Sequence, residues 1–129
     1  MNIRFDGSGV ALVTPFNQRG VNAEVLQQLV RFHIDEGTDA LIICGSKGEA
    51  ATMTAEEQRY ATEVAVEAAA GKIPIIVGCG GSDTKQVAQL GAQAAAAGAD
   101  GILLSAPPYN KPPQRGLVAH FRAVVDAAD

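Results

Sequence analysis

The residues with the most reactive side chains lie in short loops that follow apolar runs. The turn Gly45-Ser46-Lys47-Gly48 places a hydroxyl and an amine between two glycines, and Tyr109 adds a phenol in a later Pro-rich loop. Backbone N–H groups of a glycine-flanked turn at a helix start bind anions such as carboxylates. A lysine amine that is held uncharged attacks carbonyl carbons, and hydroxyl groups carry protons. These residue types therefore permit anion binding, attack by an amine and proton transfer.

Alternating strands and helices are expected to position these loops. Four times the sequence repeats a short β-branched apolar run, a turn rich in Gly, Ser or Pro, and a longer stretch with apolar residues three and four apart. This alternation predicts a parallel α/β fold of four βα units. Strands are expected near residues 10–14, 40–45, 73–78 and 101–105, and helix N-caps at Asn22, at Thr54 and at Ser82 or Asp83. Ligands of such folds bind at the carboxyl ends of the strands.

The composition excludes several classes of function. The 129 residues include 14 acidic and 10 basic side chains, and the basic ones are scattered, so no nucleic acid or membrane partner is expected. No apolar run reaches the roughly 18 residues of a membrane span, and the first residues do not form a signal peptide, which predicts a cytoplasmic protein.

Cys44 and Cys79 lie in apolar runs and are interpreted as structural thiols. His33 and His120 have no neighbours with metal-ligand spacing, so no metal site is expected.

Four motifs, taken together and in order, resemble one known family. Gly45-Ser46-Lys47-Gly48-Glu49 resembles its Gly-[Thr/Ser]-Thr-Gly-Glu signature, and Tyr109-Asn110-Lys111-Pro112 resembles the end of its Pro-Tyr-Tyr-Asn-x-Pro segment. Val13-Thr14-Pro15-Phe16 and the loop at 78–84 also match. The family is that of dihydrodipicolinate synthase and N-acetylneuraminate lyase, and the resemblance covers the whole chain. It implies that residues 1–129 are a single half-barrel domain, the parallel (β/α)4 half of a TIM (β/α)8 barrel.

The resemblance also implies the chemistry of a class I aldolase, a lyase that uses no cofactor. A lysine amine forms a Schiff base with pyruvate, and the resulting enamine adds to an aldehyde or is released by cleavage. By position, Gly45-Ser46-Lys47-Gly48 matches the turn that binds the pyruvate carboxylate, and Ser46 also matches a member of the proton relay. Tyr109 matches the relay tyrosine that reaches into a neighbouring subunit's site. The Tyr-Asn-Lys-Pro segment favours the dihydrodipicolinate synthase branch, which serves lysine biosynthesis, whereas Ser46 favours the N-acetylneuraminate lyase or sugar-acid aldolase branch.

Two positions depart from the family pattern. Lys47 stands where relatives carry a second hydroxyl residue, and Pro108 replaces the first of two paired tyrosines. The family's Schiff-base lysine is expected on the sixth strand, beyond Asp129, so the isolated chain is expected to be inactive.

A half barrel exposes unpaired strand edges and an apolar inner face, so self-association as a homodimer or higher oligomer is expected. In a twofold dimer Lys47 would lie near the sixth-strand position, which gives the hypothesis that Lys47 supplies the amine. The alternatives for Lys47 are a solvated surface lysine, or a residue irrelevant to the chemistry if the chain comes from a longer gene product.

Less specific interpretations stay open beside these. The chain could be a structural, self-associating module without catalysis. Ser46 could form the turn, and Tyr109 could pack at an interface. Glu49 is expected to satisfy loop amides, and the glycines at 78–81 are expected to allow close packing in preference to binding phosphate.

Overall fold

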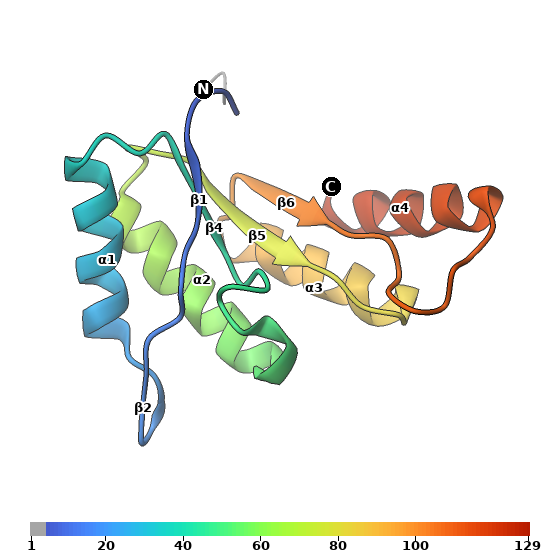
Figure 1. The fold of residues 1–129 in the computed structure, drawn as a ribbon, viewed down its shortest axis with the longest axis horizontal. Helices are drawn as coiled ribbons and strands as arrows, with labels where there is room; N and C mark the ends of the chain where they lie inside the picture. Colours follow the sequence, from blue (N-terminus) through green and yellow to red (C-terminus); the bar gives the residue numbers. More distant parts are fainter. Residues whose placement is uncertain (1–4) are drawn as a thin grey trace.

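Four parallel strands form one sheet in the computed structural model, which describes residues 5–129 (Figure 1). Val10 of the first strand lies opposite Leu41 of the second, and Val77 of the third lies opposite Ile102 of the fourth. The strands are β1 (Gly9–Ala11), β4 (Ala40–Ile43), β5 (Ile75–Cys79) and β6 (Gly101–Leu104), paired in the order β1-β4-β5-β6. Sequential parallel strands confirm the predicted fold class.

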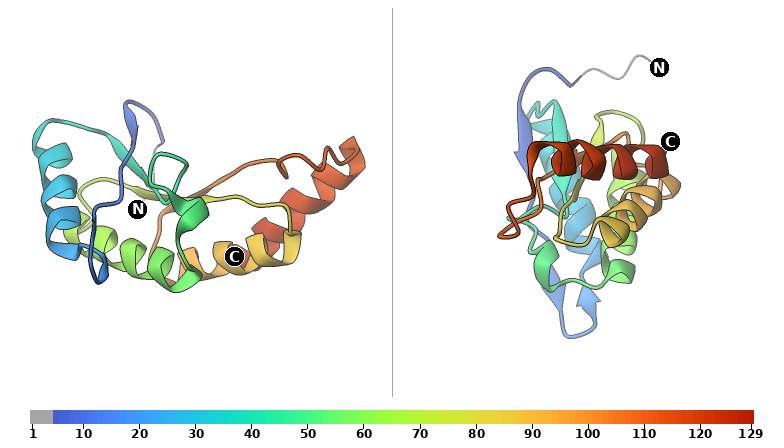
Figure 2. Two further views of the ribbon diagram at one scale, coloured as in Figure 1. Left: turned by 60° about the horizontal axis from the view of Figure 1, so that its bottom comes forward. Right: turned by 90° about the vertical axis from the view of Figure 1, so that its right-hand side faces the viewer.

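One helix follows each of these strands, as a parallel crossover requires. The helices are α1 (Ala23–Asp35), α2 (Ala55–Ala69), α3 (Thr84–Ala96) and α4 (Gln114–Ala128). All four lie on the same side of the sheet (Figure 2). Within residues 5–129, no helix covers the other side, which is the concave face of the half barrel.

The strand limits differ from the predicted ones by a few residues, and one hairpin was not predicted. β1 ends at Ala11, although the N–H of Leu12 still donates to the carbonyl of Ile42 at 2.8 Å. β5 begins at Ile75, because Pro74 lacks an N–H for the ladder. A short antiparallel pair, β2 (Phe16–Asn17) and β3 (Gly20–Val21), lies between β1 and α1.

The predicted helix starts are confirmed by their hydrogen bonds. The Asn22 side chain accepts from the N–H of Val25, and Thr54 and Glu57 form the complete capping box of α2. The third helix is capped by Asp83, whose carboxylate accepts from the N–H of Lys85 at 2.9 Å. Ser82 instead donates its hydroxyl to the carbonyl of Pro108, so the choice between these two residues is settled.

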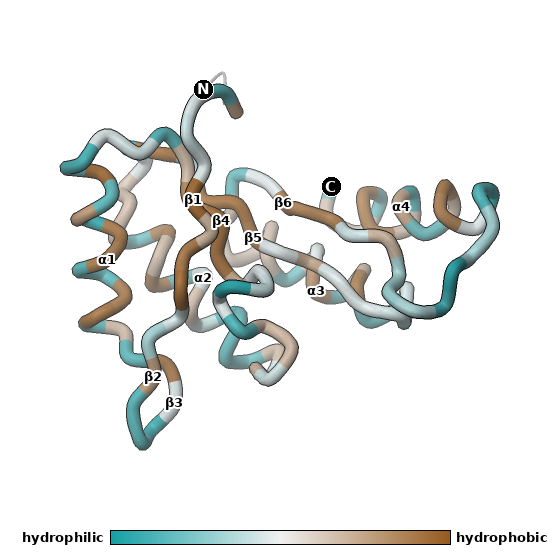
Figure 3. The backbone as a smooth tube through the Cα atoms, viewed as in Figure 1, coloured by the Kyte–Doolittle hydropathy of each residue, from teal (hydrophilic) through white to brown (hydrophobic). Residues whose placement is uncertain are grey.

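The hydrophobic core lies between the sheet and the helices. Along β5, Ile75, Val77 and Cys79 are buried against the helices, whereas Ile76 is only half-buried on the concave face. Hydrophobic residues make up most of these strands (Figure 3). Ile42 of β4 is half-buried in the same way, although a continuous apolar run such as Ala40–Ile43 is typical of a strand buried on both faces.

Candidate active site at the carboxyl ends of the strands

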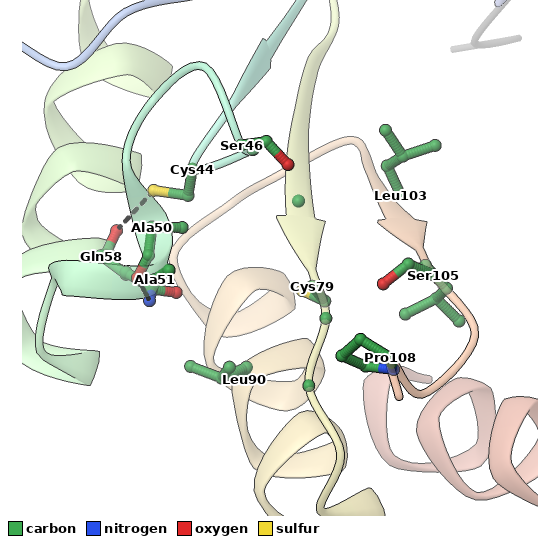
Figure 4. Close-up of a pocket in the computed structure, with 15 residues that line it drawn as sticks. Cys44, Ser46, Ala50, Ala51, Gln58, Cys79, Leu90, Leu103, Ser105 and Pro108 are labelled. Carbon is green, nitrogen blue, oxygen red and sulfur yellow. Dashed lines mark hydrogen bonds between the residues drawn. The ribbon is translucent and has the colours of Figure 1, made fainter. Parts of the chain in front are cut away.

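A cleft of about 690 Å³ opens at the carboxyl ends of β4, β5 and β6 (Figure 4). Ser46 reaches it from the turn after β4, and Ser105 reaches it from the end of β6. The other residues that line it are neutral: Cys44, Gly45, Ala50, Ala51, Gln58, Gly78, Cys79, Gly80, Gly81, Leu90, Leu103, Leu104 and Pro108. A ligand in this cleft therefore contacts uncharged polar groups and apolar surface, and no charged side chain lines it.

The turn after β4 leaves two of its own donors free. The N–H of Gly48 donates to the carbonyl of Gly45 at 3.1 Å, and that of Glu49 donates to the carbonyl of Ser46 at 3.2 Å. The N–H groups of Ser46 and Lys47 donate to no acceptor within residues 5–129. Consecutive free backbone N–H groups in a tight turn are suited to a carboxylate or another small anion.

Two neighbouring strands hold this turn in place. The hydroxyl of Thr14, just after β1, donates to the carbonyl of Gly48 at 2.7 Å in a buried bond. On the other side, Gly78 of β5 packs directly against the turn, because a Cβ at this position would lie 2.6 Å from the Cys44 carbonyl oxygen. Cys44 itself has φ 52°, a left-handed conformation that starts the turn. The turn is therefore a braced structure.

The predicted carboxylate-binding turn thus meets the cleft, but its members differ in placement. Gly45 and Ser46 line the cleft, whereas Lys47 and Gly48 do not. Lys47 is exposed, and Gly48 is buried under Thr14. Among the polar groups of the predicted turn, Ser46 is the one that the structure brings to the cleft by its side chain.

The structure does not bring Tyr109 to the cleft that Ser46 lines. It lies in the loop between β6 and α4 with φ 67°, and its side chain is 97% exposed. Its neighbour Pro108 lines the cleft, and Tyr109 does not. The tyrosine therefore takes no part in lining the cleft of its own chain.

Glu49 does not have the role expected from the sequence. It precedes the short 3-10 helix η1 (Ala50–Thr52) with φ 59°, its side chain is exposed, and it makes no capping hydrogen bond. Because the Glu49 carboxylate accepts no hydrogen bond within residues 5–129, the interpretation that it satisfies loop amides is wrong.

The two cysteines that line the cleft are protonated structural residues. Burial raises the pKa of the Cys79 thiol to about 11, and burial, followed by the proximity of Cys79, raises the pKa of the Cys44 thiol to about 11. The Sγ of Cys44 also lies 3.8 Å from the carbonyl of Gln58, to which it donates. A neutral thiol is a poor nucleophile, which agrees with the structural interpretation.

Sequence reasoning missed two contributors to the site, Thr14 and Ser105. Thr14 is a hydroxyl residue between an apolar run and a proline, and the sequence indicates only that it belongs to a motif. Ser105 is predicted from the sequence to end a strand, and it also lines the cleft, where a Cβ on Gly80 would lie 2.6 Å from its Oγ. Gly80 therefore leaves room for this hydroxyl.

The part of the chain that the structure describes contains no cluster of three or more His, Cys, Asp or Glu side chains placed to hold a metal ion. Likewise, none of the helices within 5–129 has the length and apolarity to cross a bilayer.

The sequence also matches curated relatives. A 4-hydroxy-tetrahydrodipicolinate synthase of Thermoanaerobacter sp. (strain X514) is 53% identical over 125 residues, which is 97% of this chain and 42% of the relative. The chain thus spans less than half the length of the curated relatives that it matches.

Solved structures agree with this half-length match. The crystal structure of dihydrodipicolinate synthase from Aquifex aeolicus superposes with a TM-score of 0.92 at 49% identity, covering 97% of this chain and 43% of that one. The Acinetobacter baumannii enzyme, crystallised in complex with pyruvate, gives a TM-score of 0.91 at 39% identity, covering 96% and 43%. These neighbours support the assignment of the sheet as half of a TIM barrel. The model of the dihydrodipicolinate synthetase family matches residues 4–129, and the chain belongs to that family.

Proposed function

We propose that this chain forms the pyruvate-binding half of a 4-hydroxy-tetrahydrodipicolinate synthase site, in which pyruvate condenses with an aldehyde through a Schiff base. The observation that carries the proposal is the turn after β4, where Ser46 lines the cleft and the N–H groups of Ser46 and of the adjacent Lys47 donate to no acceptor within residues 5–129. A bound pyruvate in a similar solved protein supports the choice of anion.

The turn suits a carboxylate for an electrostatic reason. Two backbone N–H dipoles and one hydroxyl provide three donors for an anion that can accept several hydrogen bonds. The turn is braced by Thr14 and Gly78, so the donors keep their positions before the ligand arrives. Preorganised donors of this kind bind an anion with little reorganisation.

Ser46 and Tyr109 have different parts in the proposed chemistry. Ser46 lies close to the bound anion and passes a proton to or from the carbinolamine oxygen. Tyr109 is 97% exposed outside its own cleft, so it acts in the site of a neighbouring copy, where its phenol extends the relay.

The amine in this proposal is Lys47 of a second copy. Its Nζ attacks the ketone carbon of pyruvate to give a carbinolamine, which loses water to give the iminium ion. Loss of a proton from the methyl group then gives the enamine that adds to the aldehyde carbon. Lys47 is exposed in this chain, so the proposed attack requires that a neighbouring copy cover it.

Binding and covalent chemistry are tested separately. Pyruvate binding is measured by saturation-transfer NMR on the 129-residue chain, and Ser46→Ala is expected to weaken it by roughly 10- to 100-fold, the loss of one hydrogen bond to a charged group. Ser8→Ala, an exposed serine outside the cleft, is the matched control and is expected to bind as the unaltered chain does. Equal binding by both variants, or no binding by the unaltered chain, would sink the proposed function.

A second candidate is a self-associating structural module without turnover, favoured by the exposed concave face of the sheet. Reduction with borohydride in saturating pyruvate separates the two. A reduced pyruvate adduct on Lys47 supports the enzyme, and an unmodified chain supports the module.

A further inference from the structure

The middle strand of the cleft, β5, presents no side chain to the ligand space at two alternating positions. Val77 and Cys79 of this strand are buried in the core against the helices. Because side chains alternate along a strand, Gly78, and Gly80 just after the strand, lie on the opposite face. Both glycines line the cleft. Backbone alone therefore forms the floor of the cleft between the ends of β4 and β6.

Polar groups of the two neighbouring strands lean over these glycines from opposite sides. On the β4 side, a Cβ on Gly78 would lie 2.6 Å from the carbonyl oxygen of Cys44 and 2.9 Å from the Cα of Gly45. On the β6 side, a Cβ on Gly80 would lie 2.6 Å from the Oγ of Ser105. The Ser105 hydroxyl therefore occupies the space that a side chain following β5 would otherwise fill.

The hydroxyls of Ser46 and Ser105 point toward each other across β5 (Figure 4). Ser46 lies in the turn after β4, and Ser105 lies at the end of β6. Cys79 is opposite Leu104 in the β5–β6 ladder, so Ser105 and Gly80 are neighbours one step further along. The placement of Ser105 is thus fixed by residues of this chain. Neither hydroxyl forms a hydrogen bond within residues 5–129.

The spacing of the strands determines which part of a ligand Ser105 reaches. Adjacent strands are about 4.8 Å apart, so the backbones of β4 and β6 are separated by roughly 10 Å. Hydrogen bonds of about 2.8 Å from each side leave roughly 4–5 Å between the two polar atoms of a ligand that bridges them. Pyruvate is too short for this, because its carboxylate and its ketone are on neighbouring carbons. An acid with an oxygen on its fourth carbon spans the gap.

An oxygen on the fourth carbon has a defined origin in the reaction, and this step rests on the proposed function. The enamine carbon bonds to the aldehyde carbon, its nitrogen becomes an iminium again, and the π electrons of the aldehyde carbonyl move onto its oxygen. That oxygen takes a proton from the relay. Hydrolysis of the iminium with one water restores the amine and releases a 4-hydroxy-2-oxo acid. The aldehyde oxygen is therefore the oxygen on the fourth carbon of the product.

We propose that Ser105 binds the oxygen of the aldehyde partner and is a specificity-determining residue of this site. The pyruvate carboxylate lies at the turn after β4, the carbon chain crosses Gly78 and Gly80, and Ser105 meets the oxygen on the fourth carbon. A hydroxyl both donates and accepts, so it serves the aldehyde oxygen before the addition and the product hydroxyl after it. The ligands that the cleft prefers are short 2-oxo acids with a hydroxyl on carbon four.

Two acids that differ by one hydroxyl group test this assignment. 4-Hydroxy-2-oxobutanoate and 2-oxobutanoate carry the same carboxylate and ketone, so the ratio of their dissociation constants isolates the contribution of the hydroxyl. Saturation-transfer NMR titrations of the 129-residue chain are expected to show that the hydroxy acid binds roughly 2- to 12-fold more tightly, the contribution of one neutral hydrogen bond. Ser105→Ala is expected to abolish this preference.

Three further variants separate the Ser105 hydroxyl from its surroundings. Gly80→Ala keeps the hydroxyl but places a Cβ where its oxygen lies, so the hydroxyl must rotate away and the preference is expected to disappear. The φ of Gly80 is not positive, so its backbone accepts alanine. Ser46→Ala is expected to weaken both acids alike and to keep the preference. Ser8→Ala, outside the cleft, is the matched control and is expected to keep both affinities.

The outcomes for Ser105 and for the proposed function are distinct. A chain that binds pyruvate but shows equal affinity for the two acids, or a Ser105→Ala variant that keeps the preference, overturns the role of Ser105 and leaves the proposed function standing. A chain that binds neither pyruvate nor either acid refutes the proposed function and this role with it.

Discussion

The Thr14 hydroxyl donates a 2.7 Å hydrogen bond to the carbonyl of Gly48, and this bond joins the end of β1 to the turn after β4. The two residues are 34 positions apart, and the bond is buried. It therefore fixes the position of the two free N–H groups in that turn relative to the sheet.

Removing this bond is expected to weaken both stability and ligand binding. Thr14→Val keeps the shape of the side chain, but the buried carbonyl of Gly48 loses its hydrogen-bond partner. This loss is expected to lower the free energy of unfolding by roughly 1–3 kcal/mol. Urea unfolding measures the loss, and pyruvate titration should show weaker binding. Thr14→Ser keeps the hydroxyl and should recover most of both. A Val variant as stable as the Ser variant would show that the bond has no structural role.

Gly78 is expected to tolerate no side chain. In Gly78→Ala the new Cβ would lie 2.6 Å from the Cys44 carbonyl oxygen and 2.9 Å from the Gly45 Cα, so strand and turn must move apart. Overpacking of this kind costs roughly 1–3 kcal/mol, seen as a lower urea midpoint. Gly45→Ala is the matched control in the same turn, because its Cβ meets nothing closer than 3.9 Å. Equal stability of the two variants would contradict the close approach.

Stability is expected to fall at alkaline pH because of the two buried thiols. Their pKa is about 11 in the folded chain, against 9.0 as the ordinary value, so the unfolded chain releases these protons first. The protonated thiols therefore stabilise the folded chain fully below pH 9. This stabilisation is lost as the pH rises toward 11, by roughly 2 kcal/mol for each thiol.

Urea midpoints measured across this range test the effect. The double variant Cys44→Ala/Cys79→Ala should show a clearly smaller alkaline decline than the unaltered chain. Parallel declines in the two proteins would assign the effect to other groups.

Replacing Lys47 should separate the contribution of its backbone N–H to binding from the contribution of its side-chain amine to the chemistry. Lys47→Ala keeps the N–H group of the turn, so the pyruvate dissociation constant is expected to change by less than about threefold. The same variant lacks the proposed nucleophile, so the adduct trapped by borohydride should disappear. Lys72→Ala, an exposed lysine just before β5, is the control that should retain the adduct. Adduct formation at full yield in Lys47→Ala would exclude Lys47 as the amine.

Most of the fold could be predicted from the sequence because its signals are local. Apolar runs of four or five residues and capping residues such as Thr54 specify elements without reference to distant parts of the chain. The β2–β3 hairpin was missed, since each of its strands has only two residues and carries no periodic pattern.

The site could be predicted less completely, because it depends on contacts between strands. The turn at Ser46 was found from its glycines and its motif, but the bond from Thr14 and the approach of Gly78 depend on which strands become neighbours. Glu49 and Tyr109 are both exposed and both have a left-handed backbone, and neither property is indicated by their residue types.

The single helical layer has a consequence for how substitutions are tolerated. In β6, Ile102 and Leu104 pack against the hydrophobic core, and Leu104 also reaches the cleft. Leu103 and Ser105, the residue after the strand, line the cleft without joining the core. A saturation scan of this strand should therefore show two interleaved phenotypes. Changes at even positions should reduce the yield of folded protein, and changes at odd positions should leave the yield intact while altering association or ligand affinity. Neighbouring residues of one strand would thus evolve under separate constraints.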